Sequence, residues 1–237
     1  MSVIAGLERD VAGCVQDYAN GSQEALADGL SAVIRARVFP RLVRDIMSDE
    51  ARFAEMARRS VWHPNGFAKI VLLAAPDYRL RLHAWRGAAV AAPEVQENVH
   101  NHRWDFATTI VAGAYWHQEF RAAEDGDAFF GYRYVAAGDR RSYRLTPVGA
   151  RALRRVFAAR LPQGARYTMS SEVLHKVVPD FTEPAVSLVL EGPHRPTEVD
   201  VYAENELGLA PVVPFVPLTA QVLAHQLAAV ASLPHLC

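Results

Sequence analysis

The chain has 237 residues, of which 51% are hydrophobic and 22% are charged, a composition that excludes a protein dominated by disorder. The formal net charge of −1 gives no electrostatic reason to expect a nucleic-acid partner. The two cysteines, Cys14 and Cys237, exclude a disulfide framework and a cysteine-rich structural zinc site.

The sequence of the N-terminal residues does not resemble a secretory signal. Met1–Asp10 lacks the basic start and apolar run of a secretory signal, and no apolar run reaches the roughly 18 residues that span a bilayer. We therefore expect a soluble, cytoplasmic protein with no membrane partner.

From about Leu7 to Arg59 the pattern is helical. Leu26, Leu30 and Val33 recur at the three- and four-residue steps of a core-facing helix. Ser48 is predicted to be the N-cap of a further helix, and a turn signal follows at residues 63–66. We predict an N-terminal helical cap over residues 1–66.

From residue 67 to 203 the hydrophobic period changes to two, which is typical of a β-sandwich or barrel. Five short runs rich in Val, Ile, Leu and aromatic residues are predicted strands: Ala68–Leu73, Tyr78–Trp85, Trp104–Ala112, Phe129–Val135 and Ala185–Leu190. Gly138-Asp139 is a predicted turn, and Thr146–Arg160 fits a strand or a helix.

The last part, residues 204–237, returns to the helical period. Pro211–Pro217 is predicted to be an extended strap, with Thr219 as N-cap of a helix packed on the barrel. The three parts are predicted to form one domain.

The most informative segment is an H-x-H pair, His100 and His102. In an extended context both imidazoles leave the same face, and two neutral imidazoles that converge suit a first-row divalent metal. The alternative is a pair of ordinary polar residues on a strand. A third histidine, His175, lies in another alternating run, which a closed barrel brings to the pair.

These residues resemble the cupin superfamily, whose first motif is G-x5-H-x-H-x3/4-E-x6-G. His100, His102 and Gly113 fall at matching places, and Gly164 and His175 have the spacing of the second motif. The resemblance covers about residues 67–192. It implies a mainly β fold, a cupin-type β-barrel (double-stranded β-helix or jelly roll), here with N-terminal and C-terminal helices.

Positions that differ from the cupin motif restrict the resemblance to one subset of the superfamily. Phe106 stands at the position of the motif's glutamate. Loss of that carboxylate is similar to the three-histidine cupins of the cysteine-dioxygenase type, the thiol dioxygenases. Their Ser-x-His-x-Tyr relay is matched by Ser187, but Val189 and Glu191 replace the histidine and the tyrosine. A thiol substrate is therefore not implied.

The resemblance implies an oxidoreductase, a non-haem iron dioxygenase. His100, His102 and His175 would hold Fe(II), and O2 would oxidise a small anionic or amino-acid-like molecule. Zn, Mn, Ni and Co suit the same ligands. One alternative is a non-oxidative metal cupin, an isomerase or lyase or an enzyme that rearranges an amino-acid intermediate in natural-product biosynthesis. Another is a non-catalytic small-molecule-binding cupin. The N-terminal helices are expected to cap the barrel or to form the contact of a homodimer.

Arg79, Arg81 and His83 alternate along one predicted strand and share a face. If this face points inward, the arginines are candidates to bind a substrate carboxylate. Because Leu80 and Leu82 suit a packed interior better, the favoured prediction places the arginines outside.

Four further residues are weaker candidates. Trp104 and Tyr115 either line the pocket or belong to the core. His117 shares a face with Glu119, and the pair is either a ligand or acid–base pair or, as favoured, part of an exposed polar face. Asp105 is a candidate to orient a ligand histidine or to become a fourth ligand.

Overall fold

The computed structural model describes residues 3–35, 38–85, 97–137, 142–180, 183–208 and 212–233. Cys237 and the predicted turn at Gly138-Asp139 lie outside these ranges. The helices are α1 (Val3–Ala19), α2 (Ala25–Val33), α3 (Val38–Ser48), α4 (Glu50–Arg59) and α5 (Ala220–Ala231).

The strands fall into two groups that form two sheets. They are β1 (Val61–His63), β2 (Phe67–Ala74), β3 (Arg79–Trp85), β4 (Val99–His100), β5 (Phe106–Ala112), β6 (Ala114–Ala136), β7 (Ser142–Pro162), β8 (Arg166–Met169), β9 (Leu174–Pro179), β10 (Ala185–Glu191), β11 (Val199–Ala203), β12 (Val213–Pro214) and β13 (Val216–Pro217).

The seven-stranded sheet has the order β13-β1-β2-β3-β10-β5-β8, and the six-stranded sheet the order β11-β4-β9-β6-β7-β12. The strand pairs in both sheets are antiparallel. The predicted fold class, mainly β with helices at both ends, is confirmed.

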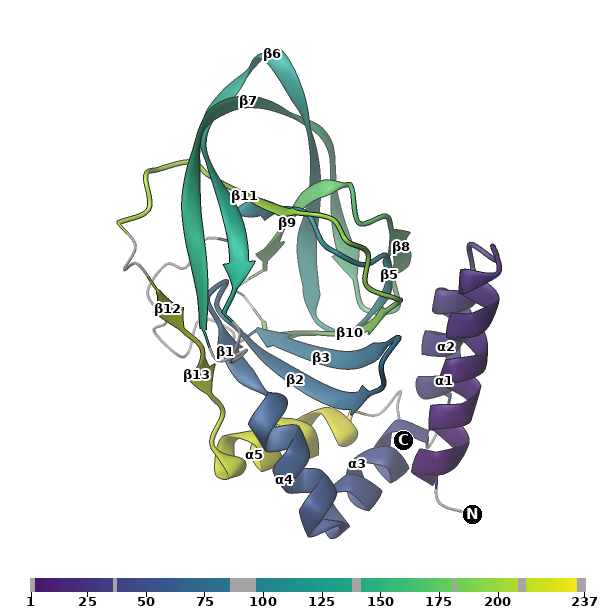
Figure 1. Ribbon diagram of the computed structural model, residues 1–237. Coiled ribbons are helices and arrows are strands. Elements are labelled where there is room, and N and C mark those ends of the chain that lie inside the picture. The colour runs from purple at the N-terminus through teal and green to yellow at the C-terminus, as the bar shows by residue number, and fades with distance from the viewer. Residues whose placement is uncertain are drawn as a thin grey trace.

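The helices form a layer on one side of the seven-stranded sheet (Figure 1). Helix α2 packs against β10 and β5, and α4 packs against β2. The largest hydrophobic core lies between this layer and the sheet, and it includes Leu30 of α2, Phe39 of α3, Leu82 of β3 and Leu227 of α5. These four side chains are at most 1% exposed. Burial of such side chains against the sheet is the main stabilising contribution of the helices.

This layer decides which face of β3 points inward. Leu80 and Leu82 belong to the core under the helices, whereas Arg79, Arg81 and His83 line a cavity on the opposite face of the strand. The favoured prediction that the arginines point outward is therefore wrong. Its physical reason is that the outer face of this sheet is covered by helices, so leucines are buried there as well.

Several element boundaries differ from the predictions, including that of the predicted strand Phe129–Val135, which is part of the longer strand β6. The segment Thr146–Arg160, which fitted a strand or a helix, belongs to strand β7. Strand β5 begins at Phe106 rather than at Trp104. Ser48 ends α3, and the N-cap of α4 is Asp49, whose side chain accepts a hydrogen bond from the Arg52 amide. Both residue types cap helices well, so the sequence alone did not separate them.

The C-terminal segment connects both sheets to a helix. Val213 and Pro214 pair with β7, and Val216 and Pro217 pair with β1. Thr219 is the N-cap of α5, as predicted, and accepts a hydrogen bond from the Val222 amide at 3.2 Å.

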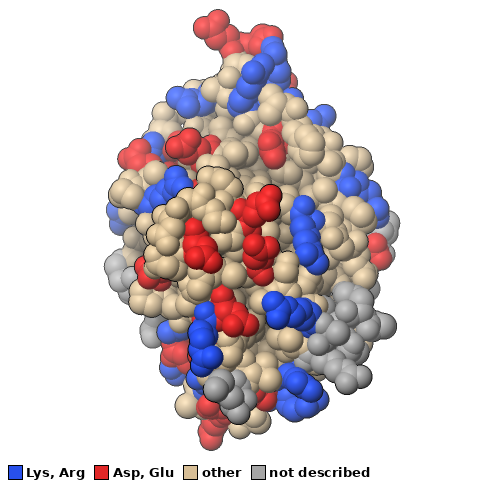
Figure 2. All heavy atoms as spheres, turned by 90° about the vertical axis from the view of Figure 1, so that its right-hand side faces the viewer, with Lys and Arg blue, Asp and Glu red and all other residues tan. Residues whose placement is uncertain are grey.

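Within the described ranges, no helix is long and apolar enough to cross a membrane. Figure 2 shows the face on the right of Figure 1, where acidic and basic side chains are interspersed.

We predict that the interface between helices and sheet contributes much of the stability. Leu82→Ala leaves a cavity in this core and is expected to lower the free energy of unfolding by about 2–5 kcal/mol in urea denaturation. Val156→Ala is the control, because Val156 is 50% exposed and such a change costs at most about 0.5 kcal/mol. Equal effects of the two substitutions would contradict this account of the core.

Candidate metal centre

Three histidines converge as the spacing predicted. One ring nitrogen each of His100, His102 and His175 lies within 4.8 Å of the other two. The Nε2 atoms of His102 and His175 are 2.9 Å apart. His100 in β4 is the register partner of His175 in β9, so strand pairing brings the third histidine to the H-x-H pair.

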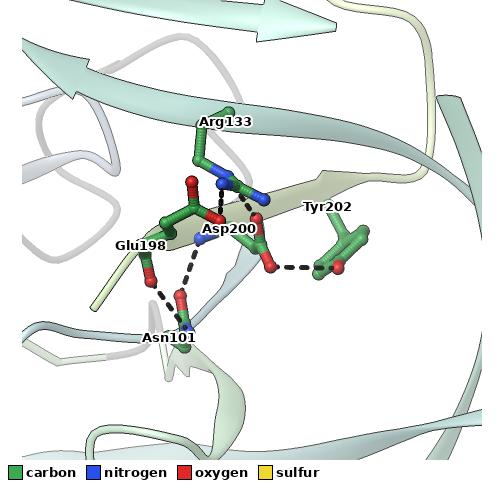
Figure 3. Close-up of polar contacts among 5 residues, drawn as sticks. All are labelled: Asn101, Arg133, Glu198, Asp200 and Tyr202. Atoms are coloured by element: carbon green, nitrogen blue, oxygen red, sulfur yellow. Dashed lines mark hydrogen bonds and ion pairs between the residues drawn. The ribbon is translucent and has the colours of Figure 1, made fainter. Parts of the chain in front are cut away.

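The residue between the first two histidines anchors the segment. Asn101 accepts a hydrogen bond at Oδ1 from the Asp200 amide at 2.7 Å, and its Nδ2 donates to the Glu198 carbonyl at 3.4 Å (Figure 3). Arg133 of β6 forms ion pairs with Glu198 and Asp200. Asn101 is thus attached to β11, and it lines the cavity together with the two flanking histidines.

The protonation of the three rings suits metal binding. The Nδ1 of His100 lies 2.9 Å from the Asn98 carbonyl, which only accepts, so Nδ1 carries the proton and Nε2 keeps its lone pair. Burial lowers the pKa of His100, and it lowers the pKa values of His102 and His175 well below the usual value. The imidazoles are therefore neutral near pH 7, which is the form that binds a metal.

One pair of the donors has the spacing of ligands to a single first-row divalent ion. Two nitrogen ligands at right angles, with bonds of about 2.1 Å, are separated by about 3 Å, and the Nε2 atoms of His102 and His175 are 2.9 Å apart. In the described ranges no other group of three or more His, Cys, Asp or Glu side chains has such a spacing.

An apolar ring occupies the place of a fourth protein ligand. Phe106 packs edge-on against His102, with ring centroids 5.1 Å apart. It also forms a hydrophobic cluster with Met169 and Val189. Phe106 and Val189 are two of the departures from the family motifs, and they are in one cluster.

The histidines open into a cavity of about 1030 Å³. Its wall includes the polar face of β3 and several aromatic side chains: Phe67, Trp85, Trp104, Tyr115, Tyr134, Tyr167 and Phe215. A pocket of this size with a few charged groups is typical of small-molecule sites.

No family model matches the chain, and no curated protein matches it. Solved structures are similar over about half of its length or somewhat more. TT1209 from Thermus thermophilus is 19% identical with a TM-score of 0.32, covering 59% of this chain and 93% of that protein. KdgF from Halomonas sp. is 17% identical with a TM-score of 0.31, covering 55% and 82%.

A third similar structure is a double-stranded β-helix protein from Klebsiella pneumoniae subsp. pneumoniae, 13% identical with a TM-score of 0.34, covering 63% of this chain and 95% of that one. Two antiparallel sheets decide the fold class of this chain, with His100 and His175 on adjacent strands, His102 directly after the first of them, and all three facing a cavity. The fold is a cupin-type β-barrel.

The cupin barrel carries positive charge on its inner wall. Arg81 is 13% exposed and forms an ion pair with Glu191, which is fully buried, and Arg79 lies 3.5 Å from the same carboxylate. Burial alone would raise the pKa of Glu191, but Arg81 and Arg79 hold it below its usual range. Glu191 thus neutralises one of the two arginines.

Trp104 and Tyr115 both line the cavity. Of the two predicted alternatives, a place in the pocket wall or in the core, the structure has the first for these two residues. The Trp104 ring contacts both parts of the site, since its centroid is 5.3 Å from that of His102 and 5.1 Å from the Arg81 guanidinium. The hydroxyl groups of Tyr115 and Tyr167 are 3.1 Å apart. Burial raises the pKa of both tyrosines, so they stay protonated at neutral pH.

Asp105 is engaged outside the cavity. Its Oδ2 accepts hydrogen bonds from the Tyr18 hydroxyl and the Arg195 guanidinium, and its Oδ1 accepts one from the Ser171 amide at 2.7 Å. The Ser171 carbonyl in turn accepts a hydrogen bond from the His102 amide at 3.1 Å. Asp105 therefore attaches α1 to the barrel and supports the backbone of a metal-ligand candidate, and its carboxylate does not reach the ring nitrogens as a fourth ligand.

His117 is buried behind His175, with ring centroids 5.5 Å apart, so its predicted exposed orientation is wrong. Its Nε2 lies 3.1 Å from the Glu119 carboxylate, and its ring packs on Tyr167. It is not among the residues that line the cavity. The reason is the register of β6 with β9, which places this part of β6 against the strand of His175.

Sequence reasoning missed two ionisable groups of the site. Glu97 is buried, its Oε1 is 3.6 Å from Nδ1 of His100, and burial raises its pKa to about 8. Lys69 of β2 lines the cavity beside the arginine wall. Neither has a motif spacing. The only signal for Lys69 was its residue type, because it and Lys176 are the two lysines of the chain.

We predict that Asn101 positions the histidines. Asn101→Ala removes the hydrogen bonds to β11 and is expected to weaken Co(II) binding by about tenfold or more, as loss of supporting contacts does at metal sites. The measurement is a spectroscopic Co(II) titration. Asn20→Ala, at an exposed asparagine after α1, is the control. Unchanged Co(II) affinity in the Asn101 variant would refute this positioning role.

Proposed function

We propose that this protein is a metal-dependent cupin enzyme that holds Fe(II) at His100, His102 and His175 and oxidises a small anionic molecule with O2. The observation that carries the proposal is a set of three neutral imidazoles that opens into a cavity with a cationic wall.

The donor set supports the choice of metal chemistry. Three neutral ligands leave the double positive charge of a divalent ion uncompensated, and Phe106 supplies no carboxylate to reduce it. Fe(II) bound there would supply open positions at which an anionic substrate and O2 meet.

The cavity wall supports an anionic substrate. Arg81 lies over the Trp104 ring, and Trp104 contacts His102, so a small molecule that reaches the histidines passes the guanidinium. The planar guanidinium of arginine is suited to hydrogen-bond a carboxylate at two points. An amino-acid-like or other small carboxylate therefore fits best: its acid group binds at Arg81 and its reactive end lies at the histidines.

The aromatic side chains make two contributions to the proposed site: they exclude water, and their hydroxyl groups form hydrogen bonds. Trp85 and Tyr115 pack together inside the barrel and leave the substrate few contacts with bulk solvent. The hydroxyl groups of Tyr115 and Tyr167 are hydrogen-bonded to each other at the cavity wall, so one donates to the other and the second is left as a donor toward the substrate. A low-dielectric surrounding strengthens each of these polar interactions.

The first test is metal content. Protein loaded with Fe(II) without oxygen and freed of excess metal is expected to retain close to one equivalent by mass spectrometry. The variants His100→Ala and His175→Ala are expected to lose it, because two remaining imidazoles bind first-row ions weakly. His225→Ala, at an exposed histidine of α5, is the control and retains the metal. Retention of metal in the first two variants would remove the basis of the proposal.

The second test is oxygen uptake. The Fe(II) protein is screened with small amino acids, thiols and aromatic acids in an oxygen electrode, and uptake that depends on one of them is expected. Turnover without oxygen uptake in the Zn, Mn, Ni or Co form would assign the site to non-oxidative Lewis-acid chemistry instead.

For a substrate found in this way, the double variant Arg81→Gln with Glu191→Gln removes the guanidinium without leaving a buried carboxylate unpaired. Loss of a charged hydrogen bond is expected to raise the KM by about 10- to 100-fold. The single variant Arg58→Gln is the control, since Arg58 pairs with Glu55 on helix α4, away from the cavity. An unchanged KM in the double variant would exclude Arg81 as the anion site.

A further inference from the structure

A second reactive group lies in the cavity outside the histidine cluster. Lys69 is on β2, opposite His83 of β3 in the strand register. The neighbouring residues Ala68 and Ile70 are buried under the helices, so the alternation of the strand directs Lys69 into the barrel. Its Nζ lies 5.3 Å from the centroid of the Phe215 ring.

Among the described residues, no ion pair neutralises the amine of the half-buried Lys69. In the described parts of the chain no carboxylate oxygen lies within the 4.0 Å ion-pair distance of its Nζ. Glu191 is the buried carboxylate that acts electrostatically on Lys69, and it is already paired with Arg81. By contrast Lys176, the other lysine of the chain, lies 2.7 Å from Glu204.

The groups that face Lys69 are mostly cationic or neutral. They come from three strands packed together and are Arg79, Arg81 and His83 of β3, Glu191 of β10 and His63 of β1. Burial and then Arg81 lower the pKa of Lys69 to about 7, and Glu191 offsets this in part. A lysine that is desolvated and lies beside another cation is the usual form of a nucleophilic amine.

Composition supports a role for the amine itself. The chain has 25 basic residues, of which only Lys69 and Lys176 are lysines. An arginine would serve as well or better as an anion-binding group in this wall. What arginine does not supply is a nitrogen that loses its proton near neutral pH.

We propose that Lys69 forms a Schiff base with a small carbonyl compound that carries an acid group, such as an aldehyde acid or a 2-oxo acid. The neutral amine attacks the carbonyl carbon, and the addition product loses one water to give the imine, so no oxidant or reductant is needed. The guanidinium groups of Arg79 and Arg81 bind the carboxylate of the same molecule.

The test uses glyoxylate with sodium cyanoborohydride at pH 7, and the full-length protein is treated both with and without bound metal. Hydride adds to the imine carbon and leaves a stable carboxymethyl group on the lysine. Peptide mass mapping of a chain with two lysines assigns it unambiguously. We expect Lys69 to be labelled at least about tenfold faster than Lys176, because burial and Arg81 lower the pKa of the Lys69 amine to about 7, whereas the Lys176 amine is held in an ion pair with Glu204.

Two variants and a second probe complete the design. Lys69→Arg keeps the charge and is expected to abolish fast labelling, whereas Lys176→Arg is expected to leave it unchanged. Propionaldehyde, which has no acid group, is expected to label Lys69 more slowly than glyoxylate. Equal labelling of the two lysines, or no preference for the acid-bearing aldehyde, would overturn the proposal. Labelling of metal-free protein keeps this result independent of the iron site.

Discussion

The helical layer on the outside of the seven-stranded sheet is the constraint on which the rest of the structure depends. It gives the leucines of β3 and β10 a buried environment outside the barrel, including Leu82 and Leu190, which are fully buried there. Most of the apolar burial that stabilises the chain is therefore made on this side. The inner face of the same sheet therefore does not have to be apolar, and Arg81, Lys69 and Ser187 lie on it.

Polar residues inside a barrel are costly, and their burial shapes the chemistry of the site. Removal from water favours the neutral form of each ionisable group, which accounts for the lowered pKa values of the histidines and of Lys69 and the raised pKa of Glu97. Arg81 stays charged because Glu191 compensates it. The same desolvation thus acts on the three histidines, on the Lys69 amine and on the Arg81–Glu191 pair.

The sequence was informative wherever the decisive interactions are local. The alternation of a strand predicted that His100 and His102 share a direction, and the alternating run around His175 predicted a second strand that a closed barrel brings to the pair. The orientation of β3 was not predictable in this way. The strand has one apolar and one polar face, and only the position of the helices decides which face points into the barrel. The support of His102 through Asp105 depends on Tyr18 in α1, a contact between residues far apart in sequence that no spacing indicates.

The departures from the family motifs are explained by one local arrangement. Phe106 of β5 is the register partner of Glu191 of β10, and Val189 lies two residues away on the same strand. Phe106 and Val189 pack together against Met169, and this cluster borders the ring of His102. A glutamate at position 106 would place a second carboxylate beside Glu191 in a buried environment, which is unfavourable unless a further cation compensates it. With Phe106 and Glu191 side by side, the buried negative charge therefore lies at the arginine wall rather than beside the histidines.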